Sequence, residues 1–174
     1  VSLSGEYTVG TGGDYATLTA AIADFNSDAI TGPVTLTLLD ATYSAETFPI
    51  TINANAGSSA TNTLTIKPAT GVDATISGSA TTLININAAD YVTIDGSNNG
   101  TDSDNLTLNN TLATGTTGIL WVASTATDGA DYVTIKNVKF IGNTPTTTVG
   151  GVIASGPTLG GAGTIPNNHL TIES

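Results

Sequence analysis

The segment of residues 95–104, DGSNNGTDSD, carries a dense set of side-chain oxygens. Its opening, D-x-S-x-N-G, matches half of an oxygen-rich calcium loop. The glutamate that closes such a loop at its twelfth position is missing, because Leu106 stands there. Asp, Asn, Ser and Gly are also the usual residues of a long turn. Calcium binding and a plain turn are therefore both open, and the candidate ligands are Asp95, Ser97, Asn99, Asp102 and Asp104.

His169 is the only histidine, and an imidazole can act as a general base near neutral pH. The one carboxylate expected near it is Glu173, and no third group completes a triad. The chain contains no arginine and no cysteine, which removes two further groups used in catalysis. His169 aligns instead with Tyr91 and Tyr132 in the strand pattern described below, which predicts an outward stacking residue. The sequence assembles no catalytic set, so we expect a protein that is not an enzyme.

Trp121 is the only tryptophan, and its ring could stack on a sugar if it projects from the surface. In the strand alignment below it stands beside Asn85, while Tyr91 and Tyr132 occupy another outward column. A shift of one residue in the local alternation would instead bury Trp121 in the core. Both placements stay open, and the candidate residues for carbohydrate contact are Trp121, Asn85, Tyr91 and Tyr132.

The charge balance restricts the partners of this chain. Its formal net charge is −11, and Lys67, Lys136 and Lys139 are the only cations. A phosphate backbone or an anionic membrane surface would be repelled, so nucleic acid is not expected as a partner. No apolar run reaches the roughly 18 to 20 residues that a membrane-spanning helix needs. Because there is no cysteine, the fold must depend on packing and hydrogen bonds.

One helix is expected near the N-terminus, over residues 17–27. Four apolar residues recur there at helical spacing and would form one buried stripe: Leu18, Ala21, Ile22 and Phe25. Thr17 is placed as the N-cap and Gly32-Pro33 as the stop. A strand over residues 34–39 follows. With a first strand before the helix, these elements predict an N-terminal cap over residues 1–47.

The remaining residues, 48–174, form short runs in which apolar residues alternate with polar ones, bounded by Asx, Gly and Ser. The runs sort into triplets that return about every 30 to 40 residues, as in a solenoid. The first predicted sheet holds residues 49–53, 82–87, 118–123 and 151–155. The second holds residues 63–67, 91–95, 132–136 and 169–173, and the third holds residues 73–77, 105–109 and 137–141. We therefore expect an all-β, right-handed parallel β-helix of three-strand coils, cut off at its C-terminal end.

The second sheet supports this alignment, because equivalent residues of stacked coils lie about 4.8 Å apart and must be compatible. Its inward positions form an apolar column: Ile66, Ile94, Ile135 and Ile172. Its outward positions form a threonine column: Thr65, Thr93, Thr134 and Thr171. The next outward residues alternate in charge: Lys67, Asp95, Lys136 and Glu173. In the third sheet, a repeated sharp corner is expected at Asp73, Asn105 and Asn137, because Asn tolerates left-handed geometry.

The entry segment GDYATLTAAI, followed by GPVTLTLLDATY and PITI, is similar to that of the pectin-lyase-like superfamily of right-handed parallel β-helices. The phrases TLTIKPATG, DYVTIDGSNNGT and VTIKNVKFIGN resemble β-helix repeats of large exported surface proteins of Gram-negative bacteria. The resemblance covers nearly the whole chain and implies an extracellular or cell-surface location. It does not imply an activity, because fold does not determine function. Lyases of the superfamily use calcium with an Arg or Lys base, methylesterases use two Asp with Arg and Gln, and hydrolases cluster Asp with His. None of these sets can be assembled here.

These features predict a non-catalytic surface module, such as a stalk or adhesin segment, whose partners are glycans or neighbouring cell-surface proteins. Calcium is the one cofactor to consider. Two alternatives stay open: the N-terminal part of a polysaccharide-active lyase, esterase or hydrolase whose catalytic coils lie beyond residue 174, and a subunit of an extracellular filament. Nothing in the sequence covers the last run, HLTIE, so we expect end-to-end self-association at an open C-terminal coil.

Overall fold

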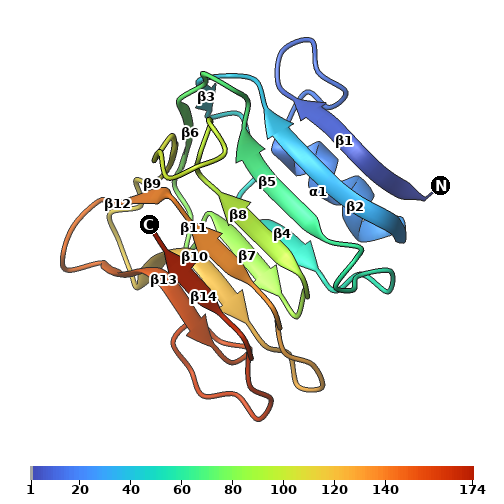
Figure 1. Cartoon of the computed structure of the whole chain (residues 1–174). Coiled ribbons are helices and arrows are strands. Elements are labelled where there is room, and N and C mark those ends of the chain that lie inside the picture. Colours follow the sequence, from blue (N-terminus) through green and yellow to red (C-terminus); the bar gives the residue numbers. More distant parts are fainter. Residues whose placement is uncertain (1) are drawn as a thin grey trace.

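Short strands of alternating polarity stack side by side and wind the chain into a parallel β-solenoid of about five turns (Figure 1). The structure is a computed structural model and describes residues 2–174. Each full turn contributes one strand to each of three sheets, and a single short helix lies near the N-terminus. The predicted all-β solenoid with an N-terminal helix is therefore confirmed.

All neighbouring strands in the three sheets pair in parallel. Sheet A consists, in spatial order, of β1 (Leu3–Val9), β2 (Ile30–Leu38), β5 (Leu64–Pro68), β8 (Val92–Asp95), β11 (Thr134–Lys136) and β14 (Thr171–Glu173). Sheet B consists of β3 (Thr42–Tyr43), β6 (Ala74–Gly78), β9 (Leu106–Asn110) and β12 (Val138–Gly142). Sheet C consists of β4 (Ile50–Asn53), β7 (Ile84–Asn87), β10 (Thr117–Ala123) and β13 (Thr148–Ser155).

The predicted register holds in sheet A. Thr93 pairs with Thr65 on one side and with Thr134 on the other, and Thr134 pairs with Thr171. The isoleucine column beside it points inward, where Ile66 and Ile94 are fully buried. Pairing also continues from Thr65 to Thr35 of β2, and β2 pairs with β1. Sheet A thus includes β1 and β2, which lie within the part of the chain that the sequence pattern assigns to the N-terminal cap.

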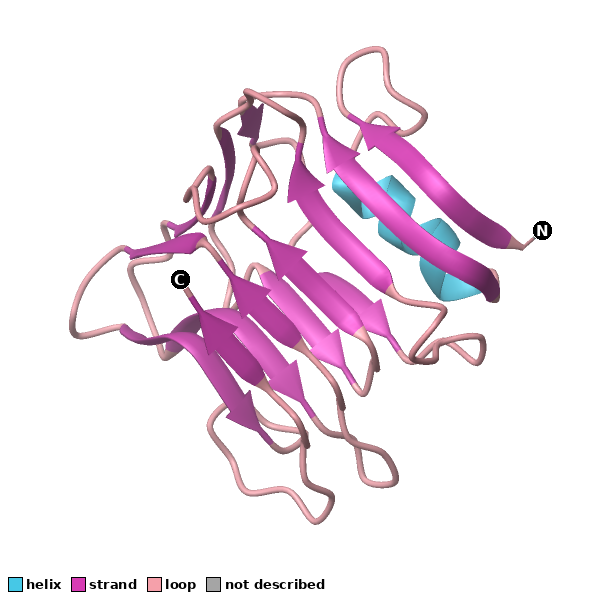
Figure 2. Cartoon of the chain, in the orientation of Figure 1, coloured by secondary structure: helices cyan, strands magenta, loops and turns pink. Residues whose placement is uncertain are grey.

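Helix α1 (Leu18–Ser27) forms where the apolar stripe was predicted, and all four residues of that stripe are buried. The side chain of Thr17 accepts a hydrogen bond from the N–H of Ala20 at 3.1 Å, as an N-cap does. The carboxylate of Glu46 also accepts the N–H groups of Leu18 at 2.8 Å and Thr19 at 2.7 Å. In Figure 2 the helix lies behind β1 and β2, where it closes the first turn of the solenoid.

The predicted stop of the helix at Gly32-Pro33 is wrong, because both residues lie inside β2. The helix ends at Ser27, and Asp28 is its C-cap. The amide of Asn55 donates to the carbonyl oxygens of Phe25 at 2.6 Å and Asp28 at 2.8 Å. These carbonyls are the groups a helix end leaves unpaired, so a residue distant in sequence completes the C-terminus.

The predicted corner of sheet B forms only in part. Asn137 has a φ of 55°, the left-handed geometry expected of it. Asp73 and Asn105 do not adopt that geometry. The amide of Asn105 instead donates to the carboxylate of Asp73, and a side-chain bond between coils takes the place of a repeated backbone bend there.

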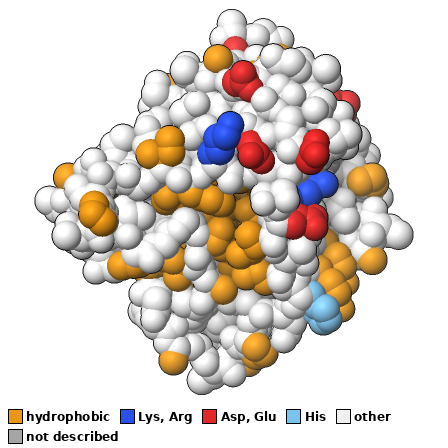
Figure 3. All heavy atoms as spheres, turned by 60° about the vertical axis from the view of Figure 1, so that its left-hand side comes forward, with side chains coloured by type: hydrophobic (Ala, Val, Ile, Leu, Met, Phe, Trp, Pro, Cys, Tyr) orange, Lys and Arg blue, Asp and Glu red, His pale blue; other side chains and the backbone are white. Residues whose placement is uncertain are grey.

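The two ends of the stack differ in cover. At the C-terminal end, Figure 3 shows a central apolar area with Lys, Asp and Glu side chains above it. Ile172 of β14 belongs to the inward isoleucine column, yet it is 59% exposed. Among residues 2–174, no helix has the length and apolar character needed to cross a membrane.

Candidate functional site

Trp121 lies on the outer face of sheet C. Its neighbours in β10, Leu120 and Val122, are fully buried and point into the solenoid, whereas Trp121 keeps part of its surface exposed. It pairs with Asn85 of β7 on one side and with Ile153 of β13 on the other. The alternative that placed this ring in the core is therefore wrong, and the outward position beside Asn85 is confirmed.

The indole ring of Trp121 is held in one orientation by the next coil. Its Nε1–H donates to the hydroxyl oxygen of Ser155 at 2.8 Å. The same hydroxyl donates to the carbonyl of Thr158 at 3.2 Å and accepts the N–H of Gly160 at 3.1 Å. A ring fixed in this way loses little conformational freedom when a ligand stacks on it.

Amide side chains extend the same outer face toward the N-terminal end. The amide of Asn87 donates to the side-chain oxygen of Asn53 at 3.0 Å, which links β7 to β4. The Oδ1 atom of Asn85 is buried and accepts no hydrogen bond from any group in residues 2–174. A buried acceptor without a partner is uncommon, and because this atom is buried it is not itself a contact point on the outer face. The face thus combines one aromatic ring with several amides.

Sequence reasoning missed Asn53, Asn87 and Ser155 as members of this face. A signal for two of them was present, because the motifs ITIN and ININ end in Asn at equivalent strand positions. Stacked coils turn such a repeat into neighbouring amides. Ser155 gave no signal of its own, since its role depends on the loop of residues 156–160 folding back on it.

Tyr91, Tyr132 and His169 form the predicted outward stack, here called the aromatic ladder. The ring centroids of Tyr91 and Tyr132 are 4.8 Å apart with an interplanar angle of 3°. Those of Tyr132 and His169 are 4.3 Å apart with an angle of 7°. Because the rings cover one another, both faces of Tyr132 are occupied by its neighbours. His169 therefore acts as a stacking residue, as predicted.

The ladder residues also have a backbone geometry that the sequence did not suggest. Each has a positive φ, between 55° and 57°, one or two residues before a strand of sheet A. Bulky residues rarely adopt this conformation, and stacking of the rings offsets its cost. The ladder belongs to sheet A and Trp121 to sheet C, so the four predicted carbohydrate-contact residues form two separate surfaces.

In the acidic loop after β8, the side-chain oxygens of Asp95 and Asn99 are hydrogen-bonded within the chain, whereas the hydroxyl of Ser97 is buried without a partner among residues 2–174. Asp95 Oδ1 accepts the N–H of Ser97 at 3.0 Å and the amide of Asn137 at 3.2 Å, and Oδ2 lies 3.2 Å from Lys136 Nζ. Burial raises the pKa of Asp95, but these three donors outweigh it and hold the pKa below its ordinary value of 3.8. Asn99 accepts hydrogen bonds from Thr101 in the same loop.

Among residues 2–174, no group of three or more Asp, Glu, His or Cys side chains is arranged to hold a metal ion. Within the loop, a cation at Asp95 would have to compete with the ammonium group of Lys136. Calcium binding by Asp95, Ser97, Asn99, Asp102 and Asp104 stays a prediction.

The pKa of the Asp90 carboxyl group is raised above its ordinary value. Burial raises the pKa of Asp90, the N–H of Asp131 donates to it at 2.8 Å and lowers the pKa, and the nearby Asp128 and Asp131 carboxylates raise it. Asp131 in turn accepts the N–H of Asn168 at 2.6 Å. These bonds join the same corner of successive coils, which is a structural use of the carboxylates.

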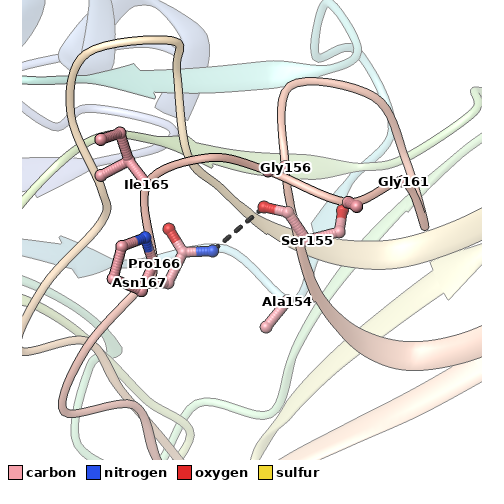
Figure 4. Close-up of a pocket in the computed structure, with 9 residues that line it drawn as sticks. Ala154, Ser155, Gly156, Gly161, Ile165, Pro166 and Asn167 are labelled. Carbon is pink, nitrogen blue, oxygen red and sulfur yellow. Dashed lines mark hydrogen bonds between the residues drawn. The ribbon is translucent and has the colours of Figure 1, made fainter.

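A pocket of about 370 Å³ lies beside Ser155, between the end of β13 and the loop that follows (Figure 4). One wall is formed by Asn167, whose amide donates to the carbonyl oxygens of Ser155 and Val122, both at 3.1 Å. Gly156, Gly161 and Gly163 also line the pocket. Ser155 is thus common to this pocket and to the hydrogen bond that holds Trp121.

No protein-family model, curated protein or solved structure matches this chain. Its resemblance to the pectin-lyase-like superfamily therefore stays a hypothesis drawn from the sequence.

Proposed function

We propose that this chain is a non-catalytic module of the extracellular space or of a cell surface, related to the pectin-lyase-like β-helices, whose outer sheet C face contacts neutral glycans. The observation that carries the proposal is the outward, hydrogen-bonded ring of Trp121 beside the amides of sheet C. A rigid solenoid would serve as a stalk or adhesin segment that holds this face in place.

The chemistry of the face suits sugars. A pyranose presents C–H groups on one side, which pack against an aromatic ring, and hydroxyl groups around its rim, which pair with amides. Trp121 supplies the ring, and Asn85 lies beside it on the same face. The amide pair of Asn53 and Asn87 lies on the same face, so the platform extends over successive coils.

The net charge of the chain favours neutral glycans over acidic ones as ligands. With a formal charge of −11, the chain repels polyanions such as uronate polymers at low salt. Neutral oligosaccharides carry no such penalty. We therefore expect neutral glycans to bind and acidic ones to bind more weakly, with the difference shrinking as salt is added.

The test uses Trp121 itself, because it is the only tryptophan and its fluorescence reports on this face alone. An array of neutral and acidic glycans identifies binders, and titration of the best one against the intact chain gives an affinity. Trp121→Ala should weaken binding at least about 10-fold, while Trp121→Phe should retain part of it. Binding of that variant series is followed by calorimetry, since the alanine and phenylalanine variants lack the fluorophore.

Tyr132→Leu is the matched control, because it removes an aromatic ring from the ladder on sheet A and leaves sheet C intact. It should bind the glycan as the wild type does. The proposal fails if no glycan binds, or if Trp121→Ala and the wild type bind equally. Release of new reducing ends or unsaturated sugars from a polysaccharide would contradict the non-catalytic part.

A further inference from the structure

Two of the five tyrosines, Tyr91 and Tyr132, form a stacked pair in the middle of sheet A. They precede β8 and β11, which pair with each other and each have a further strand on their other side. The two rings are nearly parallel, with centroids 4.8 Å apart and an interplanar angle of 3°. Both residues have a φ of 57°. Their side chains therefore leave equivalent backbone positions in the same direction, and the carbons of one ring lie close to those of the other.

The surroundings hold this pair together and leave one edge of it open. Tyr91 N–H donates to the carbonyl of Asp131 at 3.0 Å, and Tyr132 N–H donates to the carbonyl of Asn168 at 3.0 Å. His169 covers the second face of Tyr132, with ring centroids 4.3 Å apart. Tyr132 is nevertheless 46% exposed. Because both faces of its ring are covered, the exposed part is the edge of the ring.

The other three tyrosines are arranged differently. The hydroxyl of Tyr15 donates to the carboxylate of Asp24 at 2.9 Å, and burial together with that carboxylate raises the pKa of Tyr15 to about 12. Its ring is tilted by 58° against that of Tyr7, with centroids 5.9 Å apart. Tyr43 is buried, and its hydroxyl donates to the carbonyl of Val9 at 2.7 Å. None of these tyrosines belongs to a parallel pair.

The hydroxyl groups of Tyr91 and Tyr132 are available for reaction. Within residues 2–174, neither forms a hydrogen bond. A one-electron oxidant can remove an electron and a proton from each phenol, and two radicals held side by side combine faster than radicals that must meet by diffusion. The chain contains no cysteine, so a disulfide cannot link its coils in an oxidising environment.

We propose that Tyr91 and Tyr132 are a site of oxidative coupling, at which a peroxide-dependent one-electron oxidant joins the two rings into dityrosine. Each phenol loses one electron and one proton. A carbon–carbon bond forms between the ring carbons ortho to the two oxygens, and the hydrogen atoms on those carbons move to the oxygens and restore both phenols. Hydrogen peroxide takes up the two electrons and two protons and becomes two water molecules. The product is a covalent bond between successive coils of sheet A.

The test treats the intact chain with a peroxidase and hydrogen peroxide. Dityrosine is detected by its fluorescence, and the product that stays monomeric under denaturing conditions should have lost the mass of two hydrogen atoms. Cleavage before each aspartate places the five tyrosines in five different peptides. Mass spectrometry of the digest should find the peptides of residues 90–94 and 131–174 joined to each other.

Phenylalanine variants test the assignment without removing the rings. Tyr91→Phe and Tyr132→Phe can still stack but lack the phenol, so either should lower the yield of the monomeric product at least about 10-fold. Tyr7→Phe is the matched control, because Tyr7 lies in β1 of the same sheet and outside the ladder. It should leave the yield unchanged. The coupled chain should also unfold at a higher urea concentration than the untreated chain, because the new bond restricts the unfolded state.

Any of four results overturns the proposal. The first is coupling that occurs only between chains, and the second is an equal yield of the Tyr91–Tyr132 link in the folded chain and in urea. The third is a loss of two hydrogen atoms confined to the peptide of residues 131–174, which would place the bond between Tyr132 and His169. The fourth is a coupled chain without the circular dichroism of the untreated one, since the bond would then not fit the solenoid. None of these readouts depends on glycan binding.

Discussion

The two ends of the described solenoid differ in how the backbone groups of their edge strands are paired. At the N-terminal end, polar side chains take the place of a missing coil on the exposed edge of β4. The amide of Asn26 in α1 donates to the carbonyl of Thr51 at 2.8 Å, and its oxygen accepts the N–H of Asn53 at 2.9 Å. At the C-terminal end, the edge of β14 has no such partner within residues 2–174, and Ile172 is exposed.

This difference shows that an inward position and a buried position are not the same. The alternating pattern directs a side chain toward the axis, but burial requires a neighbour on each side along the axis. The N-terminal end obtains its neighbour from α1, whose apolar stripe covers the first turn. We therefore expect stability to be graded along the solenoid, highest in the middle turns and lowest at β14.

The largest expected effect compares two members of one column. Ile94→Ala removes a fully buried side chain and should lower the free energy of unfolding by about 2 to 5 kcal/mol, because it leaves a cavity. Ile172→Ala removes the same groups from an exposed position and should cost less than about 0.5 kcal/mol. Urea denaturation of both variants measures the difference. Equal losses would show that the C-terminal end is covered in solution.

The next effect concerns the N-terminal closure. Glu46→Ala removes the acceptor for the N–H groups of Leu18 and Thr19 and should cost about 0.5 to 2 kcal/mol, the usual range for loss of a helix cap. The matched change at the open end, Glu173→Ala, should cost less than about 0.5 kcal/mol, because that carboxylate has no partner within residues 2–174. Thermal unfolding followed by circular dichroism tests both. A cost at position 173 as large as that at position 46 would remove the distinction between the ends.

The middle turns should show their own pH dependence through Asp95. Its pKa is lowered in the folded state, so its contribution to stability is present above the ordinary value of 3.8 and is lost as the pH falls through the lowered pKa. Asp95→Asn should therefore cost about 1 kcal/mol at pH 7, and this difference should shrink below pH 3.8. Urea denaturation across pH 2.5 to 7 measures it. A difference that stays constant with pH would mean that the charge of Asp95 contributes nothing.

Calcium should have the smallest effect. Binding at residues 95–104 requires the ion to compete with Lys136 for Asp95, so millimolar calcium should raise the Tm by about 1 °C or less. Magnesium serves as the control. A rise of several degrees that Asp102→Asn and Asp104→Asn abolish would show that the loop rearranges around the ion.

Several elements could be predicted because their determinants are local or repeated. The start of α1 follows from Thr17 and the apolar stripe, which lie within a few turns of each other. The columns of sheet A follow from strands whose side chains alternate with a period of two and whose motifs recur in successive coils. The aromatic ladder was predicted for the same reason, since repeated motifs place Tyr91, Tyr132 and His169 one above another.

Other features could not be predicted, because their determinants are distant in sequence. The capping of the α1 C-terminus depends on Asn55, whose amide donates to the carbonyl of Phe25. The run GILWVA around Trp121 is apolar throughout, so alternation alone could not say which side the indole faces. Pairing of β10 with two neighbouring strands decided it, together with a bond to Ser155 in the next coil.

The sequence by itself determined the kind of fold, the register of its strands and the position of the helix, because these follow from the spacing of apolar residues and from motifs that recur in successive coils. Only the tertiary structure decided which inward side chains are buried, which distant residue caps the C-terminus of the helix and which ring faces solvent. Each of these depends on what the next coil supplies, and a neighbour about 30 residues away contributes packing and hydrogen bonds that no local pattern contains.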